Sequence, residues 1–545
     1  MSRTYDYVIV GAGSAGCVLA NRLSADGRHS VLLLEAGPRN RYIWLHIPIG
    51  YGKTMFHPVY NWRFQTEPQP ELCNRRIYYP RGRTLGGSSS INGLVYIRGQ
   101  RQDYDRWAAL GNPEWSWSQV LPYFRRAEAN ERGADEYHGG DGPLSVSDIP
   151  ARSELTEAFI RASEQLGIPR NDDVNGREQT GAGYLQLTTR NGIRCSTAHA
   201  YLAPARKRSN LKVETDALAT RILFEGKRAT GVRYQSGGNE VDVTARVSVI
   251  VSAGAVQSPQ LLQLSGVGPS ALLRQHRIPI VADLPVGMNL QDHLQARVLF
   301  KCTKPITTND QLRTLWGRMK IGLQWVIGRR GPLAVGIQQG VMFARTLPDL
   351  ATPDIQFIFG TLTSDKPAAA PHTFPGFTMI FFQLRPTSRG TLTIKSIDPH
   401  EPPAIQPRYL TTDEDRAAVL RGIKLVRALA NTEALKPYVL DEYMPGRDVQ
   451  GDAALLDAIR NHGTTAFHPS GTCRMGPGSD AVVDSRLRVH GIVGLRVVDA
   501  SIMPEIVSGN LNAPVVMIAE RASDLILEDA RRDGKAASAT EARAA

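Results

Sequence analysis

The sequence predicts an α/β fold in which a nucleotide-binding domain is interrupted by a second domain. A strand-length apolar run, Tyr7 to Val10, leads directly into a glycine-rich turn. A second buried-looking run of the same character, Val247 to Val251, stands far along the chain and suits the same sheet. From residue 296 to residue 450, strand-like runs alternate with helix-like segments, as expected for an α+β domain with helices on one face of a sheet.

The N-terminal segment carries the order strand, glycine turn, helix, strand and acid. The turn reads Gly11 to Gly16, and Cys17 to Leu23 then has the pattern of a helix. A second apolar strand, Ser30 to Leu34, ends in Glu35, 19 residues after Gly16. This order is typical of the dinucleotide-binding βαβ unit of Rossmann-type domains, whereas an isolated glycine turn would be weak support.

Each residue of that unit has a physical role. Gly11 permits a tight turn, Gly13 lets a pyrophosphate approach the backbone, and Gly16 lets the helix pack closely on the strand. The start of the helix offers N–H groups and the positive end of its dipole to the phosphates. Glu35 can accept hydrogen bonds from a ribose diol.

The composition excludes several classes of protein. The net charge is +12, but the basic residues are spread out, so we expect no nucleic-acid binding and at most weak attraction to a negative membrane surface. Five scattered cysteines indicate neither a disulfide framework nor a zinc site, and the 12 histidines lack metal-ligand spacing, so no metal is expected. With no long apolar run and a first strand close to the N-terminus, we expect no membrane span and no secretory signal, which favours the cytoplasm or the inner face of a membrane.

The rest of the chain predicts further elements in order. A helix is expected from about Ser153 to Gly167, and a second begins at Ser258-Pro259 with proline in its first turn and ends at Gly266 to Gly268. In the second domain we expect three strands and two helices; these are Ile355 to Phe359, Thr378 to Leu384 and Gly390 to Lys395, with helices at Gln311 to Ile327 and Asp413 to Ala430. Residues 529–545 lack apolar periodicity and are expected to be disordered.

Three other stretches have the composition of ligand-binding loops. The segment Pro80 to Gly93 combines paired glycines with three serines and suits a backbone pressed against a flat ligand. His468 lies in a loop rich in Gly and Ser, where a hydrogen-bonded structural histidine is the alternative to a functional one. A strand ends in Asp499, and Asn512 and Pro514 then suit the cap and first turn of a long apolar helix whose positive dipole end suits negative charge on a bound ligand.

Taken together, these stretches resemble the glucose–methanol–choline (GMC) family of FAD-dependent oxidoreductases, most of all its choline-dehydrogenase-like and aliphatic alcohol dehydrogenase branch. The resemblance runs from about Tyr5 to Leu527. It implies an N-terminal part at 1–300 that is mostly a Rossmann-type FAD-binding domain, in which residues at about 45–190 include cofactor-covering loops and part of the substrate domain. It further implies an α+β substrate domain at 301–450 and a C-terminal part at 451–528 that returns to the FAD domain.

The resemblance also implies the chemistry and its residues. His468 would be the base that takes the hydroxyl proton, Asn512 would hold the alcohol oxygen, and a hydride would pass from the carbinol carbon to flavin N5. The electrons would go on to a quinone, a redox protein or O₂. The residues expected to contact FAD are Gly11, Gly13, Ser14, Ala15, Gly16, Glu35, Ala36, Gly86, Gly87, Ser88, Asn92, Gly93, Val95, Asp499, Ala500, Asn512, Ala513 and Pro514.

Three departures from the family pattern bear on cofactor and substrate. Ile91 stands where some members carry a histidine bonded to the flavin, so FAD is expected to be non-covalent. Gln295 replaces a carboxylate of choline-handling relatives, and Ile358 replaces a second histidine, which favours an aliphatic or aromatic alcohol over choline. Other readings remain open here: an O₂-using oxidase, a non-redox flavoprotein such as a hydroxynitrile lyase or photodecarboxylase, a nicotinamide enzyme, or a basic binding protein.

Overall fold

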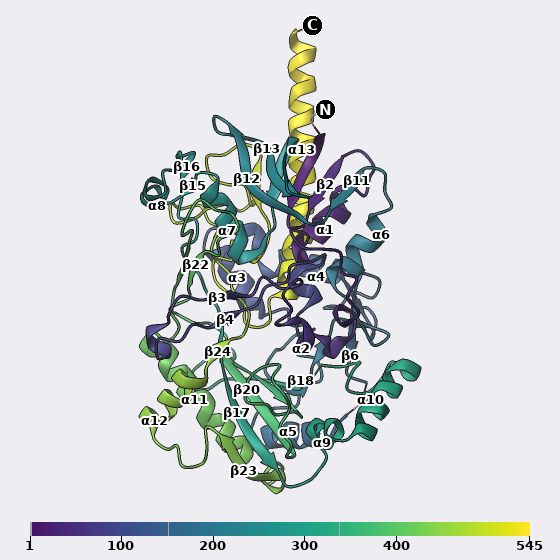
Figure 1. Cartoon of the computed structure of the whole chain (residues 1–545), viewed down its shortest axis with the longest axis vertical. Coiled ribbons are helices and arrows are strands. Elements are labelled where there is room, and N and C mark those ends of the chain that lie inside the picture. Colours follow the sequence, from purple (N-terminus) through teal and green to yellow (C-terminus); the bar gives the residue numbers. More distant parts are fainter. Residues whose placement is uncertain (1–2, 151, 337, 545) are drawn as a thin grey trace.

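Two large sheets organise the molecule, one in each half of the view in Figure 1. The computed structural model describes residues 3–150, 152–336 and 338–544, with side chains described from Thr4 to Arg532 within those ranges. The first sheet lies in the half that contains both termini, and the second lies in the opposite half. The predicted fold class, a Rossmann-type domain interrupted by an α+β domain, is confirmed.

The first sheet brings together strands from three distant parts of the sequence. Its parallel core has the order β11-β2-β1-β14-β25. The strands are β1 (Arg3–Val10), β2 (Val31–Leu34), β11 (Leu211–Glu214), β14 (Asn239–Val251) and β25 (Leu495–Val497). Val8 pairs with Val249, which in turn pairs with Leu495, so the predicted strand at 247–251 lies beside the N-terminal one. An antiparallel extension, β12 (Ala217–Glu225) and β13 (Arg228–Ser236), continues from β14.

Helices pack against this sheet, and the strand segments beneath them, Tyr7 to Val10 of β1 and all of β2, are buried. Tyr7, Val8 and Ile9 are fully buried. The helices α1 (Ser14–Leu23) and α13 (Asn512–Ala544) pack against each other, and α4 (Trp117–Ala127) packs on α13. The helix α7 (Gly254–Leu264) packs against β12.

The second sheet is antiparallel and has two different faces. Its order is β23-β17-β20-β19-β18-β7, with β24 paired to β17. The strands are β7 (Gly181–Tyr184), β17 (Leu294–Cys302), β18 (Gln338–Ala344), β19 (Ile355–Gly360), β20 (Gly376–Gln383), β23 (Val439–Met444) and β24 (Thr464–Thr465).

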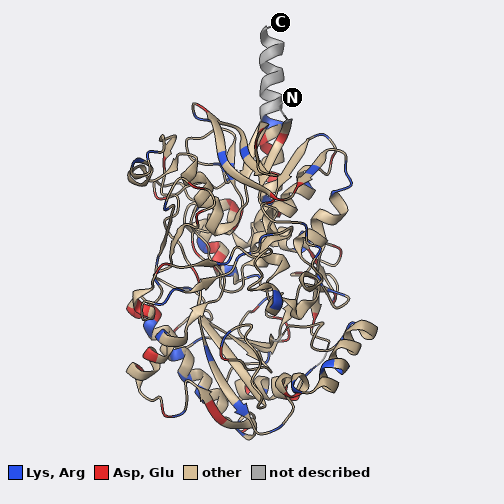
Figure 2. Cartoon of the chain, in the orientation of Figure 1, with Lys and Arg blue, Asp and Glu red and all other residues tan. Residues whose placement is uncertain are grey.

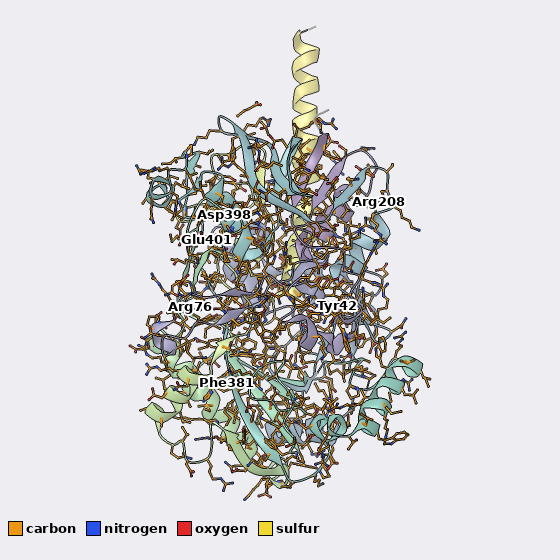
Figure 3. The ribbon with its side chains drawn as sticks, viewed as in Figure 1. Tyr42, Arg76, Arg208, Phe381, Asp398 and Glu401 are labelled. Carbon is orange, nitrogen blue, oxygen red and sulfur yellow. The ribbon has the colours of Figure 1, made fainter. Side chains whose placement is uncertain are left out.

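One face of this sheet packs on α5 (Glu154–Gln165), α11 (Asp413–Ala430) and α12 (Asp452–His462). Phe357, Phe359 and Phe381 lie in the core on that face; Phe381 is labelled in Figure 3. Because successive side chains of a strand point to opposite faces, the residues between them point toward the first domain. They line the cavity described below.

Two predicted helices differ from the structure. The helix α7 begins at Gly254, so Pro259 lies inside it instead of in its first turn; the Ser258 hydroxyl accepts a hydrogen bond from Ala253 N. The predicted helix at 311–327 is two helices, α9 (Thr308–Arg313) and α10 (Leu315–Gly328). The break occurs because Thr314 is extended and its side chain caps α10 by accepting from Gly317 N.

Within the described residues, no helix is both long and apolar enough to cross a bilayer. Asp529, the first residue of the tail that we expected to be disordered, accepts hydrogen bonds from Arg486 and Arg496. Side chains of residues 533–545 lie outside the described ones, so the disorder of that tail stays a prediction.

Candidate functional site

A long cavity runs from the glycine turn of the first sheet to the inner face of the second. Most residues that we expected to contact the cofactor line it. They are Gly11, Gly13, Ser14, Ala15, Glu35, Ala36, Gly87, Ser88, Asn92, Gly93, Val95, Asp499, Ala500 and Asn512. Gly16, Gly86, Ala513 and Pro514 are not among the lining residues; they support the turns and the helix that form the wall.

The glycine turn has the close packing that the sequence predicts. A Cβ on Gly16 would lie 1.9 Å from the Gly11 carbonyl oxygen, and one on Gly11 would lie 2.6 Å from the Ser252 carbonyl oxygen. A Cβ on Gly13 would meet only one atom, at 3.9 Å, so this glycine faces open space. No described side chain caps α1, which leaves the N–H groups of its first turn available to a phosphate.

Glu35 lies at the end of β2, as predicted, and is buried. Its carboxylate accepts hydrogen bonds from Ala12 N at 3.0 Å and Gly37 N at 2.8 Å. Burial raises the pKa of Glu35 to about 7, although these backbone hydrogen bonds act in the opposite direction. A ribose diol that donates to this carboxylate would favour its ionised form.

The glycine–serine segment forms a second wall on the same turn. Gly86 N donates to the Ala12 carbonyl at 2.7 Å, and a Cβ on Gly87 would lie 2.7 Å from Gly13 Cα. Asn92 Oδ1 accepts from Arg194 Nη1 at 2.7 Å, which fixes this side chain at the cavity wall. Burial lowers the pKa of Arg194 to about 9, so its guanidinium remains charged at neutral pH.

The carboxylate of Asp499 is used by the protein itself. It accepts from Gly254 N at 2.8 Å, from the Ser258 hydroxyl at 2.5 Å and from Ser501 N at 2.8 Å. Asp499 therefore holds the start of α7 against the strand end that we expected to approach the flavin.

His468 is buried at the far end of the cavity and takes part in a chain of hydrogen bonds. His293 Nε2 lies 2.9 Å from the Leu384 carbonyl oxygen, so Nε2 carries the proton in the neutral ring. His293 Nδ1 then accepts, and it lies 3.0 Å from His468 Nδ1, which must donate. This order makes His468 Nε2 the unprotonated nitrogen, an acceptor that faces the cavity.

The amide on His468 Nε2 belongs to Asn510, and this corrects the sequence prediction for Asn512. Asn510 Nδ2 lies 3.0 Å from His468 Nε2, and its Oδ1 accepts from Gln356 Nε2. Asn512 Oδ1 instead accepts from the Ser14 hydroxyl at 2.9 Å. The reason is the turn at Gly509, with φ +149°, which directs Asn510 toward the second sheet before α13 starts at Asn512.

Both histidines are held in the neutral form. Burial lowers the pKa of His293 to about 4. Burial, followed by the neighbouring His293 and Arg81, holds the pKa of His468 well below its usual value. A neutral imidazole is the form that can accept a proton.

Asp292 fixes the loop that carries His468, a role that no local sequence pattern indicates. It accepts from His468 N at 2.8 Å, Thr465 Oγ1 at 2.6 Å, and the hydroxyls of Tyr79 at 2.8 Å and Tyr409 at 2.5 Å. Burial raises the pKa of Asp292, and the hydroxyl hydrogen bonds oppose that rise. Four donors on one buried carboxylate specify the loop conformation.

Gln295 and Arg297 follow His293 at alternate positions along β17, and both line the cavity. Gln295 donates to the Thr465 carbonyl at 3.0 Å, and Arg297 donates to the Ser364 carbonyl at 2.8 Å. Burial lowers the pKa of Arg297 to about 10, so it stays cationic at neutral pH. The apolar residues nearby on the wall are Ile358, Leu362, Ile380 and Phe382.

Known proteins match this chain over almost its whole length. The family model described as GMC oxidoreductase matches residues 5–295, and its C-terminal counterpart matches residues 386–519. The chain belongs to the GMC oxidoreductase family. It is 45% identical to mitochondrial choline dehydrogenase from Mus musculus, over 96% of this chain and 89% of that protein. It is 46% identical to oxygen-dependent choline dehydrogenase from Pseudomonas putida KT2440, over 96% of this chain and 94% of that protein.

Solved structures of related enzymes have the same fold as this chain. Pyridoxine 4-oxidase from Mesorbium loti has a TM-score of 0.86 and 32% identity, over 95% of this chain and 98% of that chain. A variant of Aspergillus oryzae formate oxidase, studied for FAD modification, has a TM-score of 0.91 and 27% identity, over 97% and 99% of the two chains. This GMC oxidoreductase is thus an FAD-dependent enzyme that acts on a CH–OH donor.

The residues of this GMC oxidoreductase fit FAD. The uncapped start of α1 and the open face of Gly13 suit the pyrophosphate, and the buried Glu35 suits a ribose diol. Gly93 and Val95 offer a flat apolar wall, where a Cβ on Gly93 would meet only Gln338 Oε1, at 3.6 Å. These features line one continuous cavity, and His468 lines the same cavity.

Proposed function

We propose that this protein oxidises a neutral primary alcohol, aliphatic or aromatic, to its aldehyde with His468 as the catalytic base. The observation that carries the proposal is the lone pair of His468 Nε2 on the cavity side, beside the Asn510 amide. The alcohol would replace the direct hydrogen bond between these two side chains, with its hydroxyl donating to Nε2 and its oxygen accepting from the Asn510 amide. The hydroxyl proton would go to Nε2, and the Asn510 N–H would stabilise the oxygen as it becomes an alkoxide.

The chain's own residues prepare this proton transfer. His293 holds the His468 ring in one tautomer, and Asp292 holds its backbone. When protonated, His468 would be an imidazolium that donates through both nitrogens, with His293 as one acceptor. Bound FAD supplies the acceptor for the hydride that leaves the carbinol carbon; with Ile91 at the position of a flavin-bonding histidine, we propose that it is dissociable.

Charge in the substrate end of the cavity supports a neutral substrate. Among the described lining residues the acids are Glu35 and Asp499, and both belong to the cofactor end. At the substrate end, Gln295 is neutral and Arg297 is a cation. A quaternary ammonium there would meet repulsion without a counter-charge. We therefore propose that choline, the substrate named for the relatives, is a poor substrate here.

The electron acceptor is proposed to be a quinone or another redox partner, with O₂ as the alternative. Weak association with a membrane surface, which the net charge of +12 favours, would bring the enzyme to a quinone. Oxygen uptake during turnover distinguishes the two acceptors.

An anaerobic alcohol panel tests the proposed function. Adding an aliphatic or aromatic primary alcohol in the dark should bleach the flavin absorbance and yield the aldehyde. A flavin that stays oxidised with every alcohol while product forms would indicate non-redox chemistry and would contradict the proposal. Protein without a flavin spectrum would contradict it at an earlier step.

A matched pair of substrates tests the role of charge. Choline and 3,3-dimethylbutan-1-ol have the same shape and differ in the charge of one atom. The neutral alcohol should reduce the flavin at least about tenfold more efficiently, because a cation is repelled by Arg297. Arg297→Gln should narrow this ratio of efficiencies, whereas the exposed control Arg28→Gln should not. If the wild-type enzyme oxidised the two alcohols with equal efficiency, the proposed preference for a neutral substrate would be wrong.

A further inference from the structure

The helix α10 presents its large apolar side chains to solvent. Leu315, Trp316 and Ile327 are 75%, 74% and 76% exposed, and Met319, Leu323 and Val326 are also exposed. Ile321 is the buried residue of this helix. Figure 1 shows α10 at the margin of the second domain, away from both sheets. An apolar surface of this size on one helix is unusual for a face that stays in water.

Positive charge surrounds these side chains. Five basic residues, Arg313, Arg318, Lys320, Arg329 and Arg330, occur between residues 311 and 330, and no Asp or Glu occurs from residue 311 to residue 348. All five are exposed, and none forms an ion pair with a carboxylate in the part of the chain that the structure describes. Lys and Arg without acidic neighbours on α10 are visible in Figure 2.

The helix is nevertheless firmly attached to the domain. Trp325 Nε1 donates to the Gly192 carbonyl at 2.9 Å, and the Arg329 guanidinium lies 4.1 Å from the centre of the Trp325 ring. At the other end, Asn309 of α9 donates to the Thr363 carbonyl at 3.1 Å. The apolar face is therefore held outward by specific contacts and is not a loosely packed segment.

Both ends of α9–α10 lead to the wall of the cavity. Thr308 N donates to the Thr361 carbonyl, and the segment that follows includes Leu362 and the exposed Ala368, which line the cavity. Beyond α10, the Leu333 carbonyl accepts from Ile49 N, close to the lining residue Tyr51. A surface on which α10 rests would lie next to the part of the cavity that reaches solvent.

We propose that α10 is a docking helix that lies on an anionic lipid bilayer. Leu315, Trp316, Leu323 and Ile327 would enter the boundary between headgroups and acyl chains, and the five cations would contact anionic headgroups. Each cation near such a surface adds attraction that salt screens, and the apolar residues add attraction that salt does not screen. The bilayer also dissolves apolar alcohols and quinones, so docking would bring the cavity close to its substrate and its electron acceptor. This last point rests on the proposed function.

Vesicle flotation of the full-length holoenzyme tests the proposal without an activity readout. The protein should float with vesicles of phosphatidylcholine and phosphatidylglycerol, and less with phosphatidylcholine alone. The triple variant Leu315→Ser, Trp316→Ser and Ile327→Ser should bind at least about tenfold more weakly, because it lacks the inserted side chains. A matched triple of exposed residues elsewhere, Ile280→Ser, Ile397→Ser and Val493→Ser, should bind as the wild type does.

A charge reversal separates the electrostatic part. Arg318→Glu with Lys320→Glu should abolish the preference for anionic vesicles, while the exposed control pair Arg206→Glu with Lys207→Glu should retain it. Binding of the apolar triple at wild-type strength would overturn the proposal. So would a stable dimer in light scattering that dissociates in that triple, because a second copy would then cover the face. Either result would leave the alcohol panel unaffected.

Discussion

Replacing His468 with alanine should slow flavin reduction by a saturating alcohol by about 10²–10⁴-fold, the usual contribution of a positioned general base. The reason is that Nε2 of His468 is the unprotonated nitrogen on the cavity side, and the variant has no replacement there. FAD should remain bound, since the glycine turn and Glu35 lie at the other end of the cavity. Anaerobic stopped-flow absorbance measures the rate, and the flavin-to-protein ratio measures occupancy.

The control for this variant is the exposed His400→Ala, which should reduce at the wild-type rate. The pH profile adds a second check. Because the pKa of His468 is held well below its usual value, the wild-type rate should stay constant as the pH falls through 6.5 and decline only at lower pH, where His468 gains a proton. A rate for His468→Ala within tenfold of the wild type would contradict the assignment.

Replacing Asp292 with alanine should lower the free energy of unfolding by about 3–5 kcal/mol, the range for removing one partner of a buried charged network. The variant leaves the Tyr79, Tyr409 and Thr465 hydroxyls without their acceptor, together with His468 N. Denaturant unfolding of the holoenzyme measures the loss. The exposed Asp349→Ala is the matched control and should change stability little.

Asp292→Asn separates the charge from the contacts. It keeps the size of the side chain and one acceptor oxygen, so it should be less destabilised than Asp292→Ala. It should still reduce more slowly than the wild type, because the position of His468 depends on this network. An Asp292→Ala protein with wild-type stability would show that these four hydrogen bonds contribute nothing net.

Local patterns explain why so much of the fold was predictable. Strand β1, the turn at Gly11 to Gly16 and Glu35 follow one another in the sequence, and their geometry depends on short-range sterics. The helix α11 has the predicted bounds, Asp413–Ala430, because a capping Thr412 and apolar periodicity define it locally. The split of the helix at 311–327 depended on one extended residue, Thr314, which periodicity does not reveal.

The site was less predictable where it depends on contacts between distant segments. Two asparagines precede α13 with one residue between them, and only the turn at Gly509 decides that Asn510 and not Asn512 contacts His468. The pairing of His293 with His468 joins residues 175 positions apart, so no local pattern could give it. Arg297 has a local signal, because it follows His293 and Gln295 at alternate positions and alternate side chains of a strand share one face.

His468 can act as the base only in one tautomer, and ¹⁵N NMR of protein labelled at histidine measures that tautomer directly. The signals of His468 are those lost in His468→Gln. At neutral pH we expect a protonated Nδ1 and an unprotonated Nε2, because Nδ1 donates to His293 and Nε2 faces the cavity. A proton on Nε2, or an imidazolium with both nitrogens protonated, would contradict the role of His468 as the base.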